Sequence, residues 1–202
     1  LGPYTVLTHD EPLVNGNDLT LYEDRDGKVY AFWNGSKVMY AAEVDLDRMK
    51  LVEGSQHVIF RTSSSDWDKI GIEGPYCIFH EGTYYLFYSS WSRGYEIGYA
   101  TAGHPMGPWT KYEGNPVYGA QNPNACEKNG LEYTDAGDGF YRAVGHNEVW
   151  TGPDGRFWIS CHGIPREDPV PFLVIDPIDI VDGVIRIEGP THHKVSVPLG
   201  KR

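Results

Sequence analysis

Short runs of hydrophobic and aromatic residues alternate along the chain with turns that contain glycine. In three places an acidic residue and a glycine separate two such runs, and the run after the turn is rich in aromatic and branched side chains. A tight turn between two strand-like runs is typical of a β-hairpin. The sequence therefore predicts three β-hairpins, with their turns at Asp26-Gly27, Glu81-Gly82 and Asp154-Gly155.

The spacing of these turns indicates a repeated unit. They begin at residues 26, 81 and 154, and the longer interval holds an insertion around residues 119–139. Repeats of several strands at this spacing are typical of propeller blades. Helix signals are weak, because only residues 44–51 suit a helical turn while proline, glycine and β-branched residues dominate elsewhere. The pattern predicts an all-β fold, with a β-sandwich as the alternative to the propeller.

The segment Leu1 to Thr5 is repeated almost residue for residue by Met106 to Thr110, where it follows two strand-like runs. We therefore expect residue 1 to lie inside a repeat unit whose earlier strands are absent from this chain. Five blades of ~45–50 residues need roughly 230–250 residues. The expectation is one domain, residues 1–202, forming an incomplete five-bladed β-propeller with about four blades. Its predicted units are a blade tail (1–15), three fuller blades (16–65, 66–117 and 118–165) and a closing segment (166–202).

Charge excludes one class of partner. The chain carries 17 lysine and arginine residues against 28 aspartate and glutamate residues, a net charge of −11. A surface this acidic repels phosphate backbones, so we expect no nucleic-acid partner. No apolar run approaches the ~20 residues that span a bilayer, so we expect no membrane partner.

Aromatic residues make up 13% of the chain. Their flat faces suit either the C–H faces of sugar rings or the packing between blades. Trp33, Trp91 and Tyr95 are the candidates for a sugar-binding surface.

The three cysteines, Cys77, Cys126 and Cys161, form no CxxC pair. They do not make a zinc site or a disulfide framework. We expect buried free thiols; a single disulfide, of unassigned pairing, is the alternative.

Polar groups precede each predicted hairpin, at the start of the strand that lines the channel of a propeller. They are Asp18, Glu73 and His146. A carboxylate held at such a position needs partners or acquires a shifted pKa. Two carboxylates with opposed pKa shifts are what glycoside cleavage requires.

The segment Ile72-Glu73-Gly74-Pro75-Tyr76, followed by the strand-like run 82–90, resembles the general-acid blade of glycoside hydrolase family 43. These enzymes are five-bladed propellers that act on arabinofuranosides and β-xylosides. The resemblance implies an inverting glycosidase in which Glu73 is the proton donor. It implies that Asp18 tunes the pKa of this acid and orients it, although Leu19 follows Asp18 where the family usually has a small residue and proline.

Further roles follow from the same resemblance. His146 matches the family's channel histidine, which helps to hold calcium or another cation in many members. Arg166 is the candidate for the sugar-contacting arginine of the closing blade. The family's catalytic base is an aspartate on the first blade, which would precede Leu1, so we expect the base to be missing from this chain. Burial and the charge of Asp18 are expected to raise the pKa of Glu73.

The alternative function is a non-catalytic module that at most binds a sugar, or an inactive propeller that another chain completes. The expected partner of the hydrolase is an oligosaccharide or polysaccharide. Strand edges exposed at the open seam would also pair with a second copy or a complementing chain. Family members are secreted, periplasmic or cytoplasmic; a secreted or periplasmic location is favoured, and the sequence does not decide.

Overall fold

The structure is a computed structural model that describes residues 2–6, 11–134, 137 and 139–198. Its strands form three antiparallel sheets, so the predicted all-β fold is confirmed. The three predicted hairpins are present as β1–β2, β6–β7 and β11–β12. Gly27, Gly82 and Gly155 take the left-handed conformation that these turns require, with φ of 81°, 86° and 82°.

Each sheet begins with its innermost strand and is built outward in chain order. The first sheet contains β1 (Asn17–Glu23), β2 (Val29–Gly35), β3 (Val38–Asp45), β4 (Lys50–Leu51) and β5 (His57–Arg61). The second contains β6 (Glu73–His80), β7 (Thr83–Ser90), β8 (Gly94–Ala102), β9 (Thr110–Lys111) and β10 (Tyr118–Gln121). The third contains β11 (Tyr141–Thr151), β12 (Phe157–Pro165), β13 (Phe172–Val181) and β14 (Val184–Ile187).

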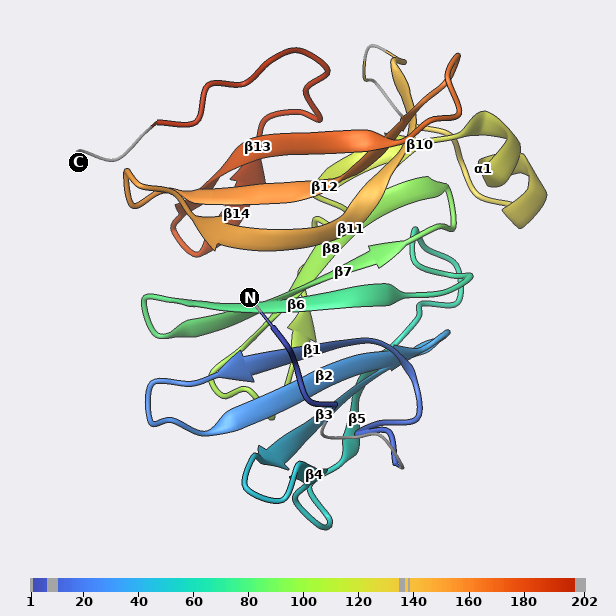
Figure 1. The fold of residues 1–202 in the computed structure, drawn as a ribbon. Helices are drawn as coiled ribbons and strands as arrows, with labels where there is room; N and C mark the ends of the chain where they lie inside the picture. The colour runs from blue at the N-terminus through green and yellow to red at the C-terminus, as the bar shows by residue number, and fades with distance from the viewer. Residues whose placement is uncertain (1, 7–10, 135–136, 138, 199–202) are drawn as a thin grey trace.

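The sheets are stacked like neighbouring blades, with the second between the other two (Figure 1). The innermost strands β1, β6 and β11 contact one another in that order. Aromatic and aliphatic side chains fill both interfaces between the sheets. Phe32 and Met39 of the first sheet pack with Leu86 of the second, and Phe87 of the second belongs to the same core as Ile159 of the third. This packing places the three inner strands side by side.

The sheets divide the chain differently from the predicted units 118–165 and 166–202. Strand β10 pairs with β8, so residues 118–121 complete the second sheet. Strand β13 pairs with β12, which places residues 172–187 in the third sheet and not in a separate closing segment. The described residues thus form three sheets. The predicted blade tail, residues 1–15, contains no strand among its described residues 2–6 and 11–15.

The insertion around residues 119–139 contains a helix that the sequence pattern does not reveal. Helix α1 (Pro123–Asn129) is seven residues long, and the side chain of Asn122 caps it by accepting a hydrogen bond from the Asn124 N–H. The C-terminal cap, Gly130, is left-handed at φ 64°. This helix is too short to show a 3.6-residue hydrophobic period. Among the described residues, no helix is long and apolar enough to cross a membrane.

All three cysteines are buried free thiols, as predicted.

A buried ion pair ties the loop before β6 to strand β9. The Asp68 side chain is fully buried, accepts a hydrogen bond from the Ser63 N–H and pairs with the Lys111 ammonium group. We expect Lys111→Met to lower the free energy of unfolding by about 3–5 kcal/mol, because it leaves a buried carboxylate without a counter-charge. Chemical denaturation measures this loss.

The control is Lys28→Met, which breaks an exposed pair with Glu43 and should cost about 0–1 kcal/mol. Equal losses in the two variants would show that the buried pair contributes no more than a surface one.

Candidate active site

The three inner strands share an irregularity, which lies at the first residues of β1 and β6 and in the middle of β11. The pairing register shifts between Asn17 and Thr20 in β1, between Glu73 and Tyr76 in β6, and between Gly145 and Glu148 in β11. At each shift one residue takes a positive φ: 53° at Asp18, 58° at Gly74 and 56° at His146.

Bulges of this kind redirect side chains and are frequent beside active sites. The left-handed conformation is uncommon for aspartate and histidine, so the surrounding contacts must hold it. The register also places Asp18 and His146 at equivalent positions, with Glu73 one residue earlier in its own strand.

Hydrogen bonds between sheets hold two of these bulges. The N–H of Gly74 donates to Asp18 Oδ2 at 3.2 Å, which joins the second sheet to the first. The N–H of His146 donates to the hydroxyl of Ser89 at 2.9 Å, which joins the third sheet to the second. Each bond fixes the backbone next to a candidate functional side chain. Asp18, Glu73 and His146 therefore come together where the three inner strands bulge.

The carboxylate of Glu73 is the centre of this group. Its side chain is 28% exposed, and its Oε1 lies 3.8 Å from Nδ1 of His146. The hydroxyl of Tyr95 donates a short hydrogen bond to the same Oε1. The Tyr95 oxygen also lies 3.3 Å from His146 Nδ1. Because the tyrosine gives its only hydrogen to Glu73, the histidine nitrogen is the donor in this last contact.

The electrostatics correct one expectation. Burial raises the pKa of Glu73, but the contact with the His146 ring, the hydrogen bond from Tyr95 and the positive charge of His146 outweigh it and hold the pKa below its usual value. The sequence analysis expected a raised pKa, because it counted burial and Asp18 but not these two donors. Without a sugar, Glu73 is therefore a carboxylate at neutral pH.

The partners of Glu73 shift accordingly. The contact with the Glu73 carboxylate raises the pKa of His146, against the effect of burial, and the charge of Asp18 adds to the rise. Burial, followed by the hydrogen bond and charge of Glu73, raises the pKa of Tyr95 well above its usual range. Tyr95 therefore remains a neutral hydrogen-bond donor.

Two of the predicted sugar-binding aromatics are not exposed platforms. Trp33 is 1% exposed and stacks on Tyr40, with ring centroids 5.4 Å apart. Tyr95 is 7% exposed, and its ring lies so close to Gly145 that a Cβ there would come within 2.5 Å of it. Both side chains pack inside the protein because strand alternation turns them inward from β2 and β8. Trp91 is partly exposed and lies over Gly71, two residues before Glu73.

Arg166 follows β12 and contacts the chain on both sides of α1. Its guanidinium donates to the carbonyl of Gln121 at 2.9 Å and to the hydroxyl of Tyr133 at 3.2 Å. These bonds attach the insertion to the third sheet. A role for Arg166 in sugar binding stays a prediction.

The described residues do not supply a metal site of their own. Among them, no group of three or more histidine, cysteine, aspartate or glutamate side chains is placed to hold an ion. The Nδ1 of His146, the predicted ligand, is engaged with Tyr95 and Glu73. A hard cation such as calcium prefers oxygen ligands. A cation held by His146 in the central channel stays a prediction.

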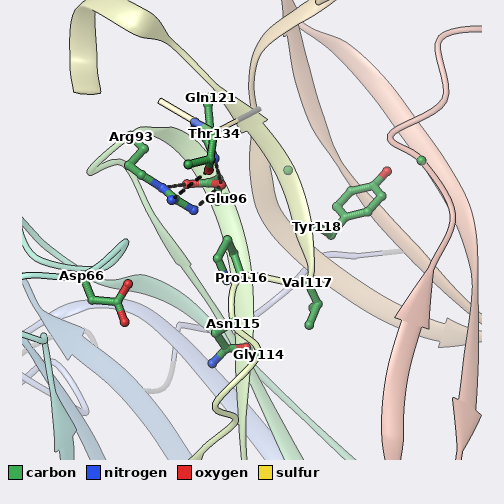
Figure 2. Close-up of a pocket in the computed structure, with 12 residues that line it drawn as sticks. Asp66, Arg93, Glu96, Gly114, Asn115, Pro116, Val117, Tyr118, Gln121 and Thr134 are labelled. Carbon is green, nitrogen blue, oxygen red and sulfur yellow. Dashed lines mark hydrogen bonds and ion pairs between the residues drawn. The ribbon is translucent and has the colours of Figure 1, made fainter. Parts of the chain in front are cut away.

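A polar cavity of about 440 Å³ lies on the opposite face of β8 from this group. Glu96 lines it, and as the neighbour of Tyr95 in the strand it points to the other side. Figure 2 shows the Glu96 carboxylate held by Arg93 and Gln121. Its charge is thus neutralised within the protein, and the arrangement is a structural ion pair.

Sequence reasoning missed two contributors to the site. Ser89 holds the His146 backbone, and the Tyr95 hydroxyl binds Glu73. Nothing in the sequence near Ser89 signals its role, because the bond forms only when two sheets pack. The sequence suggests a role for the ring of Tyr95, whereas the hydroxyl makes the contact with Glu73.

Comparison with known proteins gives a family-model match. The model described as Glycosyl hydrolases family 43 matches residues 2–185. None of the curated proteins matches the chain.

Solved structures match over most of the chain. A thermostable family-43 glycoside hydrolase is 28% identical with a TM-score of 0.72, over 91% of this chain and 61% of that one. An endo-1,4-beta-xylanase from Bacteroides thetaiotaomicron VPI-5482 is 25% identical with a TM-score of 0.70, over 89% of this chain and 61% of that one. An exo-1,5-alpha-L-arabinanase from a bovine ruminal metagenomic library is 22% identical with a TM-score of 0.65, covering 89% and 59%, and supports the fold alone.

These matches confirm the predicted propeller architecture, of which the described residues form three blades. The chain spans about three fifths of the length of the first two structures, at 61% of each.

Proposed function

Because the chain belongs to family 43 of the glycosyl hydrolases, we propose that the protein hydrolyses arabinofuranosyl or β-xylosyl linkages of plant polysaccharides with inversion at the anomeric carbon. One observation carries this proposal. Glu73, at the start of an inner strand, is held by Tyr95 and His146, and the carboxylate of Asp18 binds the adjacent backbone N–H from the neighbouring sheet. This is a partly exposed acid that other groups hold in place at the centre of a propeller.

In the proposed reaction Glu73 donates a proton to the glycosidic oxygen as the bond to the anomeric carbon breaks. A water molecule attacks that carbon from the opposite face and gives its proton to a second carboxylate, the base. In inverting enzymes the two carboxyl groups lie about 6.5–9.5 Å apart, which leaves room for the water. We assign the base to none of the described residues.

Sugar binding supplies the protonation state that this reaction needs. The 28% of the Glu73 side chain that is exposed faces water in the free protein. A bound sugar removes that water, and the loss of hydration favours the neutral acid. We therefore expect the pKa of Glu73 to rise when the substrate enters, toward the value that a proton donor needs.

Trp91 is the aromatic residue that supports sugar binding best. It is partly exposed, and its indole lies over Gly71, just before Glu73. We expect Trp91→Ala to raise KM about tenfold with little change in kcat, because a flat aromatic face contributes about 1 kcal/mol or more to contacts of this kind.

Steady-state kinetics on a pentoside measure both constants. Trp91→Phe, which keeps an aromatic face, should recover most of the affinity. A fall in kcat with unchanged KM would contradict the assignment of Trp91 to sugar binding.

A second candidate function is sugar binding without hydrolysis, by a propeller that a second copy or another chain completes. One observation favours an additional partner. Leu19 and Leu21, on the innermost strand β1, are 39% and 48% exposed. In a closed propeller, a neighbouring sheet would cover such side chains.

One panel of substrates separates the two candidates. The intact protein is incubated with chromogenic arabinofuranosides and xylosides and with arabinan and xylan oligosaccharides. Hydrolysis predicts release of pentose or of the chromophore from at least one of them. Binding that calorimetry detects without any product would instead establish the second candidate, and neither binding nor release would contradict both.

A further inference from the structure

We propose that Tyr95 positions Glu73 for proton donation. The Tyr95 hydroxyl donates a hydrogen bond to Oε1 of Glu73, so the acidic proton is carried on Oε2. The inference rests on the proposed function of Glu73 as the proton donor. It assigns to Tyr95 a role different from the sugar platform that its sequence position suggests.

The ring of Tyr95 is fixed on several sides. It is 7% exposed, in the second residue of β8. Gly145 of β11 lies directly against it, in a space that no Cβ would fit. The imidazole of His162 lies beside it, with ring centroids 5.3 Å apart. A tyrosine held in this way loses little further freedom when its hydroxyl makes a hydrogen bond.

The direction of the hydrogen bonds follows from the donors available. His146 Nδ1 donates to the Tyr95 oxygen, and Tyr95 in turn donates to Glu73 Oε1. Because Oε1 of Glu73 accepts a hydrogen bond from the Tyr95 hydroxyl, Oε1 does not also carry the carboxyl proton on that side. When Glu73 is protonated, Oε2 is thus the oxygen that carries the proton, and it can face a sugar.

The consequence for the reaction is specific. The proton moves from Oε2 to the glycosidic oxygen, the bond between that oxygen and the anomeric carbon breaks, and Glu73 is left as a carboxylate. The hydrogen bond from Tyr95 to Oε1 stabilises this new negative charge. The attacking water adds to the anomeric carbon as a hydroxyl group and gives its other proton to the base carboxylate. Tyr95 thus acts through Glu73 and needs no contact with the sugar.

The test compares Tyr95→Phe with a matched control on the same strand. Tyr99, four residues along β8, is 1% exposed, and its hydroxyl accepts a hydrogen bond from the Ile185 N–H. Both substitutions remove one buried hydroxyl and keep the ring. Only the first removes a contact with Glu73, so a general loss of packing would affect both variants alike.

Leaving-group dependence is the kinetic readout. We expect Tyr95→Phe to lower kcat about tenfold on pentosides with alkyl or sugar leaving groups, the effect of losing one hydrogen bond to a charged group. On dinitrophenyl pentosides, whose leaving group needs no proton, kcat should change less than about twofold. Tyr99→Phe should show no such difference. An equal loss on both substrate classes in Tyr95→Phe would overturn the proposal.

A second readout needs no hydrolysis. In infrared difference spectra, the antisymmetric carboxylate band of Glu73 is identified by its disappearance in Glu73→Gln. This band should shift in Tyr95→Phe and stay in place in Tyr99→Phe. An unmoved band in Tyr95→Phe overturns the role of Tyr95. If the intact protein cleaves no pentoside, the proposed function fails, and the infrared result still shows whether Tyr95 holds Glu73.

Discussion

Replacing Glu73 by glutamine is expected to lower kcat by about 10²- to 10⁴-fold on pentosides with a poor leaving group, the range that general acid catalysis contributes. Glutamine has nearly the same shape and keeps an oxygen that can accept from the Tyr95 hydroxyl. It has no acidic proton to give to the leaving oxygen. The change therefore removes the chemistry and leaves most of the packing, and initial rates at saturating substrate measure the loss.

The pH dependence of the unmodified protein should report the same group. A proton donor is active below its pKa, and activity falls as pH rises through that pKa. The contact with His146 and the hydrogen bond from Tyr95 hold the pKa of Glu73 low in the free protein. The alkaline fall in kcat/KM, which reflects the free protein, should therefore occur at a lower pH than the fall in kcat, which reflects the sugar complex. Glu73→Gln should abolish both falls.

Glu81→Gln is the matched control. Glu81 lies in the turn that ends the same strand, and its side chain is 85% exposed. This variant should keep the rate and pH profile of the unmodified protein. Near-normal turnover in Glu73→Gln on an alkyl pentoside would exclude Glu73 as the proton donor.

Asp18→Asn is expected to have the second largest effect, a fall in kcat of about 100-fold, the upper end for a hydrogen bond that involves a charge. Asp18 accepts the N–H of Gly74, which fixes the backbone beside Glu73. Asparagine tolerates the left-handed φ of 53° found at this position, so the substitution removes the charge while keeping the bulge.

The pH profile gives the direction of the Asp18 effect. Its negative charge disfavours ionisation of Glu73. Without that charge the pKa of Glu73 falls, and the alkaline limb of kcat/KM should move to lower pH. Asp26→Asn, in the exposed turn that ends β1 and starts β2, should leave the limb in place. A limb that moves to higher pH in Asp18→Asn would contradict the assigned role.

Local sequence signals predicted much of the fold. The acidic residue and glycine at each hairpin turn are sufficient to locate β1–β2, β6–β7 and β11–β12, because the left-handed turn needs a glycine wherever the surrounding strands lie. The polar residues on the inner strands could also be predicted, since Asp18, Glu73 and His146 interrupt apolar runs. The short helix α1 and the pairing of β10 with β8 leave no comparable local pattern.

The parts of the site that escaped prediction depend on contacts between sheets. The alternation of side chains shows that Trp33 and Tyr95 point to one side of their strands, but not what covers that side. Trp33 meets Tyr40, whereas Tyr95 meets Gly145 and the carboxylate of Glu73. The direction of the Glu73 pKa shift was wrong for the same reason. It is the sum of burial and two donors from other strands, and only the folded arrangement brings them together.

A crystal structure of Glu73→Gln with an arabino- or xylo-oligosaccharide bound would examine the whole arrangement directly. The account predicts that the sugar lies across the bulges of β1, β6 and β11, with a glycosidic oxygen within hydrogen-bond reach of residue 73, about 2.6–3.2 Å. A sugar bound only elsewhere on the protein, with residue 73 facing solvent, would contradict it.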